Sequence, residues 1–193
     1  RPSVTPVKTA QNSVNRIIFF LGESMTSSDH RSEMPTNQSL VTDASDASAP
    51  QKDSLWRLEL GDWSTLRASA APIRLEVFVH EQQVPLEEEI DALDAVCVHA
   101  VAFDAQGCAL ATGRLLPDGH IGRMAVRKTA RTQGLGSAVL NALTQQARQK
   151  GFVEVVLSAQ THAKGFYLRH GFVAEGVEYL DANIPHILMR KML

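Results

Sequence analysis

The sequence is organised around residues 121–150, which read IGRMAVRKTA RTQGLGSAVL NALTQQARQK. Residues 121–126 are apolar enough for a buried strand, and a basic loop follows at 127–134. From Leu135 onward, apolar residues recur at i, i+4, i+8 and i+12, which predicts an amphipathic helix. Gly151 is the expected end of that helix. The stretch therefore predicts a strand, a loop and a helix in succession.

The junction between this loop and this helix suits a polyanion. The first amides of a helix have no acceptors within the helix, and the helix dipole adds a partial positive charge there. Gly134 and Gly136 leave those amides open to a phosphate, and Arg127, Lys128 and Arg131 add full charges. An ordinary connection with a basic surface loop explains the same pattern equally well, so the rest of the chain must decide.

Two well-known phosphate-binding motifs are excluded. The dinucleotide fingerprint needs a glycine where this chain has Val139, and the P-loop needs a Gly-Lys-Ser/Thr triplet that the chain lacks. The remaining motif, Arg131-x-x-Gly134-x-Gly136, resembles the acetyl-CoA pyrophosphate loop of the GNAT N-acetyltransferase superfamily, whose signature is Gln/Arg-x-x-Gly-x-Gly/Ala. The sequence around His80 lacks the second histidine of a zinc peptidase, and Gly-x-Ser-x-Gly is absent. The remaining histidines show no metal-ligand spacing, so no metal is expected.

Length and composition favour one soluble domain with an appendage. The chain has 193 residues, a net charge of −2 and a pI of about 6.4, so it carries no overall nucleic-acid footprint. The apolar run Ile17–Leu21 is shorter than the ~20 residues that span a bilayer. Cys97 and Cys108 lie in apolar, strand-like runs and are expected to be buried free thiols, with a disulfide between neighbouring strands as the alternative. We expect a cytoplasmic protein that does not bind membranes.

The first 53 residues differ from the rest. From Gly22 to Ser54 the chain is dominated by small polar residues and proline, which offer little to bury. We expect a disordered tail or extension at 1–53 and a folded domain at 54–193. The predicted elements are a strand from Leu55 to 60, a helix at 66–82 broken at Pro72, strands at 95–103, 108–116 and 121–126, a helix at 135–150, a strand at 152–158, a helix at 161–170, and strands at 172–174 and 187–191.

This order predicts an α+β domain with a mixed, mostly antiparallel sheet of six to seven strands flanked by helices. It is similar, element for element, to the GNAT fold. Further stretches resemble the ElaA-type branch of these acetyltransferases from about Leu55 to Leu193, namely residues 74–82, 89–94 with His99, 113–117, 159–172 and 184–186.

The resemblance implies where acetyl-CoA is held. In this superfamily the fourth strand carries a bulge and splays from the fifth, so backbone groups around Met124 and Val126 would hold the acetyl-thioester and the pantetheine arm. Gln160 would lie near that arm. The residues implied around the pyrophosphate are Arg131, Gln133, Gly134, Gly136 and Ser137. Related loops often carry a basic residue where this chain has Gln133.

Acetyl transfer to an amine needs a neutral amine, a stabilised oxyanion and a protonated leaving thiolate. An alkyl ammonium has a pKa near ~10.4, so its deprotonation at neutral pH costs roughly 4–5 kcal/mol and favours a base. Tyr167 resembles the family tyrosine that protonates the thiolate. The alternative is a tyrosine whose ring packs in the core and whose hydroxyl lies at the surface.

The acceptor side is less defined by the sequence. Glu89 and Asp91 are ranked first as the base, and Glu81, His99 and His186 lie in segments that could line the acceptor site. A run of acids such as 87–89 is usually a solvated face, but in related folds this loop closes the acceptor side and could attract a cationic amine. His99 fits equally well as a hydrogen-bonded core residue.

The sequence as a whole predicts an N-acetyltransferase that moves an acetyl group from acetyl-CoA directly to a primary amine of a small molecule or peptide. Two alternatives remain open. One is an acyl-homoserine-lactone synthase-like enzyme, because such sequences share an Arg-x-x-Val-Phe pattern with residues 74–78. The Arg131-x-x-Gly134-x-Gly136 loop argues against this alternative. The other is a non-catalytic CoA-binding or interaction module. The acceptor amine is left open, and so is a homodimer.

Overall fold

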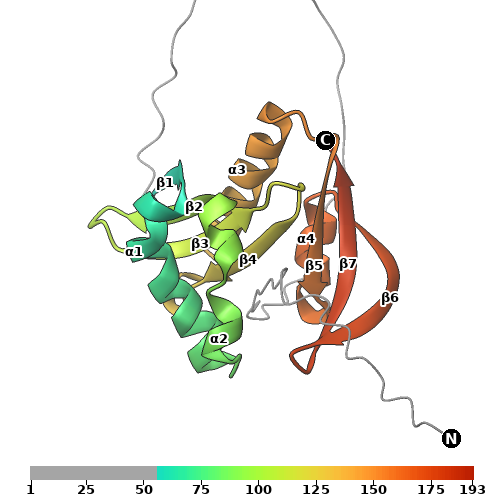
Figure 1. Ribbon diagram of the computed structural model, residues 1–193, viewed down its shortest axis with the longest axis horizontal. Coiled ribbons are helices and arrows are strands. Elements are labelled where there is room, and N and C mark those ends of the chain that lie inside the picture. Colours follow the sequence, from blue (N-terminus) through green and yellow to red (C-terminus); the bar gives the residue numbers. More distant parts are fainter. Residues whose placement is uncertain (1–55) are drawn as a thin grey trace, which may run out of the picture.

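The computed structural model describes residues 56–193 of the chain, so the tail expected at 1–53 and the start of the predicted domain at residue 54 lie outside the described residues. The described part has seven strands and four α-helices (Figure 1). The strands are β1 (Trp56–Gly61), β2 (Val98–Asp104), β3 (Ala109–Leu115), β4 (Ile121–Val126), β5 (Glu154–Gln160), β6 (Val173–Asp181) and β7 (Ile184–Met192). The α-helices are α1 (Trp63–Arg74), α2 (Leu86–Glu89), α3 (Leu135–Gln149) and α4 (Lys164–Arg169).

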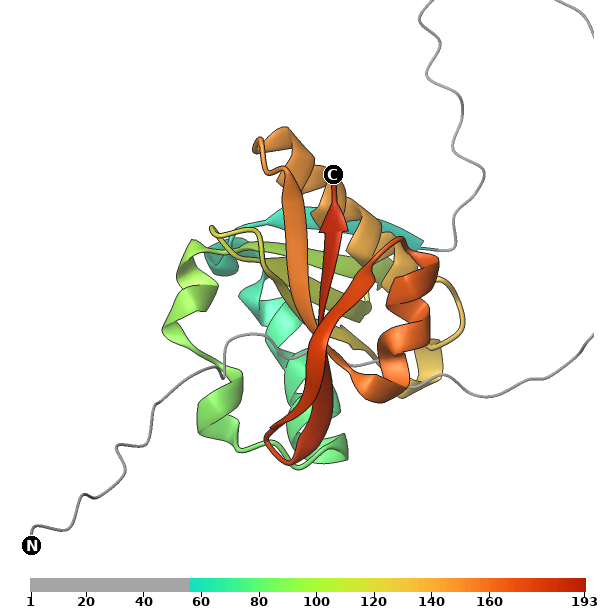
Figure 2. The same ribbon diagram turned by 90° about the vertical axis from the view of Figure 1, so that its right-hand side faces the viewer.

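The strands form two antiparallel sheets, and this confirms the predicted α+β fold. The first sheet has the order β1-β2-β3-β4, and the second has the order β5-β7-β6. An isolated parallel bridge between His120 and Val156 joins them at one end of β4 and β5. Figure 2 shows the strands of the second sheet running across the direction of the first. The splay of β4 from β5, implied by the family resemblance, is therefore present.

Helices cover opposite faces of the first sheet because the side chains of its strands alternate. In β2, Ala100 and Ala102 belong to the core cluster that contains α3, whereas Val101 and Phe103 pack with α1. The cluster on the α3 side extends into β5, β7 and α4, and it therefore joins the two sheets into one core. No helix in residues 56–193 is long and apolar enough to cross a bilayer.

The helix expected at 66–82 is not broken at Pro72. Instead, α1 runs through Pro72 to Arg74 and continues as a π-helix from Leu75 to Glu81. Its N-cap is Asp62, whose carboxylate accepts the Thr65 amide at 2.9 Å. Glu81 is the last residue of this π-helix, and its carboxylate contacts Arg131 in the loop after β4.

Three other boundaries differ from the sequence prediction. A 3-10 helix from Ala92 to Val96 replaces the start of the strand expected at 95–103, because Asp91 and Asp94 form a capping box there. Strands β6 and β7 form a longer hairpin than expected, turning at residues 182 and 183. The prediction for the cysteines was half wrong: Cys97 is buried, but Cys108 is exposed because it lies in the turn before β3 rather than in the strand.

Candidate active site

The loop after β4 ends in a left-handed glycine at the start of α3. Gly134 is the N-cap residue with φ of +79°, a conformation that glycine adopts without steric cost. The first helical hydrogen bond runs from the Ala138 amide to the Gly134 carbonyl oxygen at 3.0 Å. The amides of residues 135–137 therefore precede the first hydrogen bond of a 15-residue helix, which is the arrangement that attracts anions.

A cavity of about 190 Å³ lies at this helix start. Its walls come from the end of β4, the loop, the first turn of α3 and one side of α4. The lining residues are Val126, Ala130, Arg131, Thr132, Gly134, Leu135, Gly136, Ser137, Phe166, Arg169 and His170. A Cβ atom added at Gly134 would meet no protein atom within 4 Å, so the space beside its backbone belongs to the cavity rather than to the core.

Five residues that the sequence assigned to acetyl-CoA line this cavity together: Val126, Arg131, Gly134, Gly136 and Ser137. The other three lie elsewhere. Gln133 donates its side-chain amide to the Thr129 carbonyl oxygen at 3.2 Å, Met124 is buried in the core, and Gln160 donates to the Gln82 side chain at 3.3 Å.

Arg131 is held in the cavity wall by two contacts. Its Nε donates to the Val126 carbonyl oxygen at 3.1 Å, and its Nη2 donates to the Glu81 carboxylate at 2.6 Å. The Arg131 side chain is only 11% exposed and that of Glu81 is 28% exposed. A residue expected on the acceptor side is thus paired with a residue expected to bind the cofactor.

Sequence reasoning missed the wall that α4 contributes. Phe166, Arg169 and His170 face the cavity from this helix, and the Nδ1 of His170 donates to the Phe166 carbonyl oxygen at 2.9 Å. The spacing of Phe166 and Arg169, three residues apart on one helix face, was the available signal. Arg169 therefore adds a second arginine to the cavity.

The expected bulge is present in β4. Thr112 pairs with Ala125 and Arg114 pairs with Gly122, so that Arg123 and Met124 together lie opposite the single residue Gly113. Arg123 has a φ of +51°, which is unusual for a residue with a side chain.

Tyr167 lies on α4 and is completely buried, between the edges of Phe166 and Phe172. Its hydroxyl does not lie at the surface, which was the alternative reading of this residue. Burial raises the pKa of Tyr167 well above its usual value, so the hydroxyl keeps its proton at neutral pH.

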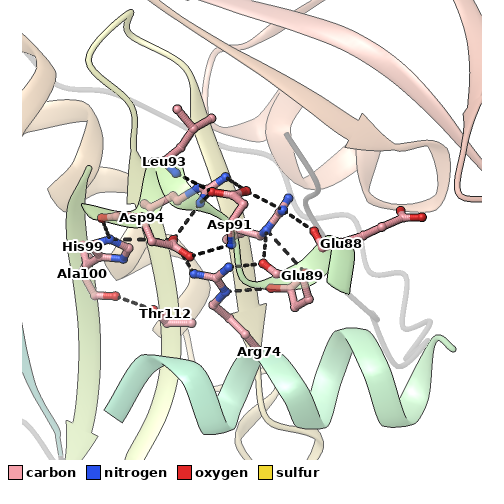
Figure 3. A network of polar contacts seen from close by, with 11 residues as sticks. Arg74, Glu88, Glu89, Asp91, Leu93, Asp94, His99, Ala100 and Thr112 are labelled. Atoms are coloured by element: carbon pink, nitrogen blue, oxygen red, sulfur yellow. Dashed lines mark hydrogen bonds and ion pairs between the residues drawn. The ribbon is translucent and has the colours of Figure 1, made fainter. Parts of the chain in front are cut away.

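The acidic loop between the π-helix and β2 is folded around three buried arginines (Figure 3). Arg74 bonds Glu89 at 2.7 Å and Asp94 at 2.6 Å, and it also donates to the Glu89 carbonyl oxygen. Arg114 bonds Asp94 at 2.7 Å and both carboxylate oxygens of Asp91 at 2.9 Å. Arg123 is the third member. Glu89, Asp91 and Asp94 thus form an ion-pair network with the arginines, whereas Glu87 is exposed to solvent.

The two carboxylates ranked as bases have different environments. Burial raises the pKa of Glu89, against the opposing charges of Arg123 and Arg74. Burial acts in the same direction on Asp91, but the hydrogen bond and charge of Arg114 outweigh it and lower the pKa of Asp91. Glu89 therefore has the stronger affinity for a proton.

The two histidines occupy different regions. His99 is buried in β2 against the Asp94 carbonyl oxygen at 2.9 Å, and burial lowers its pKa. His186 in β7 lies opposite Gln160 of β5 and Tyr179 of β6, and it stacks on the ring of Tyr179. The Nδ1 of His186 donates to the Ile184 carbonyl oxygen at 2.8 Å. His186 and Gln160 therefore share one face of the second sheet, and His99 belongs to the arginine network.

Comparison with known proteins identifies the family. Residues 64–193 match the model of the acetyltransferase (GNAT) domain. The chain belongs to the GNAT acetyltransferase family. A relative from Bacillus subtilis (strain 168), described as the uncharacterized N-acetyltransferase YjcF, is 41% identical over 122 residues, covering 62% of this chain and 87% of the relative.

Solved structures of GNAT proteins have the same architecture. An acyl-CoA N-acyltransferase from Pseudomonas aeruginosa has a TM-score of 0.63 and 36% sequence identity, covering 70% of this chain and 99% of the other. Escherichia coli ElaA also has a TM-score of 0.63 and covers the same shares, but at 24% identity it supports a shared fold only. GNAT proteins bind an acyl-CoA and an acceptor substrate. The cavity at α3 is bordered by helix amides and two arginines, which are groups that bind phosphates in proteins.

Proposed function

We propose that this GNAT domain is an N-acetyltransferase of the ElaA-type branch, which moves an acetyl group from acetyl-CoA directly to a primary amine of a small molecule or peptide. The observation that carries the proposal is the cavity at the start of α3, where Gly134, Gly136 and Ser137 lie beside Arg131 and Arg169. In this proposal these five residues hold the diphosphate, and the bulged end of β4 holds the pantetheine arm through backbone groups of Met124 and Val126.

Tyr167 is assigned as the proton donor to the leaving thiolate. Its buried hydroxyl stays protonated at neutral pH, which is the state that a donor needs before the transfer. When the amine nitrogen forms its bond to the acyl carbon and the carbon–sulfur bond breaks, the Tyr167 proton passes to sulfur. The nitrogen then gives up its second proton to become a neutral amide, and this proton restores the tyrosinate, directly or through solvent, while the base returns its proton to solvent.

Glu89 is assigned as the base that removes the proton from the acceptor ammonium. Burial raises the pKa of the Glu89 carboxylate, whereas the hydrogen bond and charge of Arg114 outweigh burial and lower the pKa of Asp91, so Glu89 is the stronger proton acceptor of the two candidates. Glu81, His99 and His186 are retained as the acceptor side. Of these, Glu81 lies next to the cofactor cavity through its contact with Arg131.

The proposal is tested by a thiol-release assay with acetyl-CoA across polyamines, amino acids, aminoglycosides and peptides. Acetyl transfer to at least one class of primary amine, with acetyl-CoA preferred over longer acyl-CoA thioesters, is the expected result. Binding of coenzyme A without turnover of any amine would contradict the assignment as an enzyme and favour a CoA-binding module. Turnover only with an acylated carrier protein and S-adenosylmethionine would favour the lactone-synthase alternative.

A further inference from the structure

The arginine in the β4 bulge has a backbone conformation that is unfavourable for a residue with a side chain. Arg123 is fully buried and has a φ of +51°, although a side chain disfavours this backbone region. The bulge sets the direction of the following residues 124–126, whose backbone groups are proposed to hold the acyl-CoA arm. A glycine would adopt the same backbone conformation without strain. The contacts of the arginine side chain must therefore compensate for the strain of this conformation.

The side chain of Arg123 reaches the acidic loop between the π-helix and β2. This loop carries the residue assigned as the base and is called the acceptor loop below. Its Nε donates to the Glu89 carbonyl oxygen at 3.1 Å, and its Nη2 donates to the Glu88 carbonyl oxygen at 2.9 Å. These two carbonyl groups lie at the C-terminal end of the short helix α2, where backbone carbonyls receive no hydrogen bond from within the helix. Arg123, which belongs to strand β4, therefore caps the C-terminal end of α2.

The same guanidinium also faces the loop carboxylates. Its Nη2 lies 3.0 Å from Asp91 Oδ2, and its Nε lies 3.4 Å from Glu89 Oε2. One side chain thus contacts the backbone and the carboxylate of the residue assigned as the base. Arg74, at the end of α1, donates from its Nε to the other carboxylate oxygen of Glu89, Oε1, at 2.7 Å.

The other residue of the bulge is fixed from the opposite face of the sheet. A Cβ atom added at Gly113 would lie 2.5 Å from Met124 Sδ and 2.9 Å from a Leu143 methyl of α3. The Met124 side chain therefore occupies the space that a side chain at Gly113 would take. The bulge is held between α3, through Met124, and the acceptor loop, through Arg123.

We propose that Arg123 is a positioning residue that fixes the β4 bulge and the Glu89 carboxylate relative to each other, and thereby aligns the acyl thioester with the base. This inference rests on the proposed function. Arg123 contacts the base but touches neither the acyl thioester nor the acceptor amine in this proposal. Its length and fork allow it to bind two carbonyls and two carboxylates at once, which a lysine ammonium cannot reproduce.

The test compares Arg123→Lys with Arg114→Lys. Arg114 is equally buried in the same network, and its side chain bonds the carboxylates of Asp91 and Asp94. Coenzyme A affinity by calorimetry reports on the α3 cavity, and kcat and KM for acetyl-CoA report on alignment. We expect Arg123→Lys to bind coenzyme A within about twofold of wild type but to lose at least about tenfold in kcat, and Arg114→Lys to keep most of kcat.

A pH profile separates alignment from charge. The charged groups that face Glu89 are Arg74 from α1, Arg114 from β3 and Arg123 from β4, and Asp91 and Asp94 share these arginines. Arg123→Gln removes a charge that opposes the raised pKa of Glu89, so the acid limb of kcat/KM should move to higher pH. Arg123→Lys keeps the charge, and its acid limb should stay near that of wild type.

Gly113→Ala tests the bulge without touching the network, because its Cβ would displace Met124 from the opposite face. It should lose kcat while its acid limb stays in place, and it decides the question if the Arg123 variants do not fold. Equal losses of kcat in Arg123→Lys and Arg114→Lys, or wild-type kcat in Gly113→Ala, would overturn the positioning role. A wild-type protein without turnover would instead refute the proposed function. In that case, amide chemical shifts of Met124 and Glu89 that move together in Arg123→Lys, but not in Arg114→Lys, would still support the coupling.

Discussion

The contact between Arg131 and Glu81 predicts that removing a carboxylate strengthens cofactor binding. Arg131 lines the cavity at α3, but its Nη2 is bonded to Glu81 at 2.6 Å. A diphosphate that recruits this nitrogen must displace the carboxylate. The substitution Glu81→Gln keeps the size of the side chain and removes the competing charge, whereas the contact of Arg131 Nε with the Val126 carbonyl oxygen is untouched.

The expected size of the effect follows from the exposure of the pair. The Arg131 and Glu81 side chains are 11% and 28% exposed, and a partly solvated ion pair contributes about 0.2–1 kcal/mol. Removing that competitor should lower the Kd of coenzyme A by about 1.4-fold to 5-fold, since 1.4 kcal/mol corresponds to a factor of ten. The gain should shrink at high salt, because screening weakens the pair in the free protein.

The assay is titration calorimetry with coenzyme A at low and high ionic strength. Glu76→Gln is the matched control, because Glu76 faces Arg127 at 3.4 Å in a similar surface pair and Arg127 does not line the cavity. The control should leave the Kd unchanged. A weaker affinity in Glu81→Gln would refute the competition and would mean that Glu81 holds Arg131 in its binding position.

Three further variants test other parts of the site and its support. Tyr167→Phe should lower kcat by at least about a hundredfold with little change in coenzyme A affinity, as expected for the loss of a proton donor; unchanged turnover in steady-state kinetics would remove Tyr167 from the mechanism. Arg169→Gln should raise the Kd of coenzyme A by at least about tenfold, since hydrogen bonds to charged groups are worth about 1.5–3 kcal/mol; equal affinity by calorimetry would show that α4 does not contact the ligand. Asp94→Asn should lower the free energy of unfolding at pH 7 by about 3–5 kcal/mol, because it leaves Arg74 and Arg114 with one fewer buried partner. Burial opposes ionisation of Asp94, but Arg74 and Arg114 outweigh burial and lower the pKa of Asp94 below 3.8. The Asp94 carboxylate therefore contributes to stability above that pH, and this contribution is lost as the pH falls through the lowered pKa. A loss of unfolding free energy in urea denaturation that is as large at pH 2 as at pH 7 would contradict this.

The grouping of residues around the start of α3 was predictable because it is local in sequence. Arg131, Gly134 and Gly136 lie within six residues, and a strand–loop–helix connection brings them together whatever the rest of the chain does. The positive φ of Gly134 is a backbone requirement that the residue type itself indicates. The order of elements likewise predicted a mixed, mostly antiparallel sheet flanked by helices, and the family resemblance implied the β4 bulge.

The acceptor side depends on contacts between distant residues, and the sequence pattern did not reveal them. Glu89 and Arg123 are 34 residues apart, and Arg74 and Asp94 are 20 apart. The run 87–89 has the composition of a solvated loop, yet Glu89 is fully buried because three arginines from α1, β3 and β4 surround it. Arg169 was missed for a similar reason, since only the packing of α4 beside the loop turns it toward the cavity.

The most direct test of the account is a structure of the protein with bound coenzyme A. The diphosphate should contact the amides at Gly134, Gly136 and Ser137 at the start of α3, with Arg131 and Arg169 beside it. A diphosphate bound at any other place on the protein would contradict the central claim that the first turn of α3 is the cofactor site.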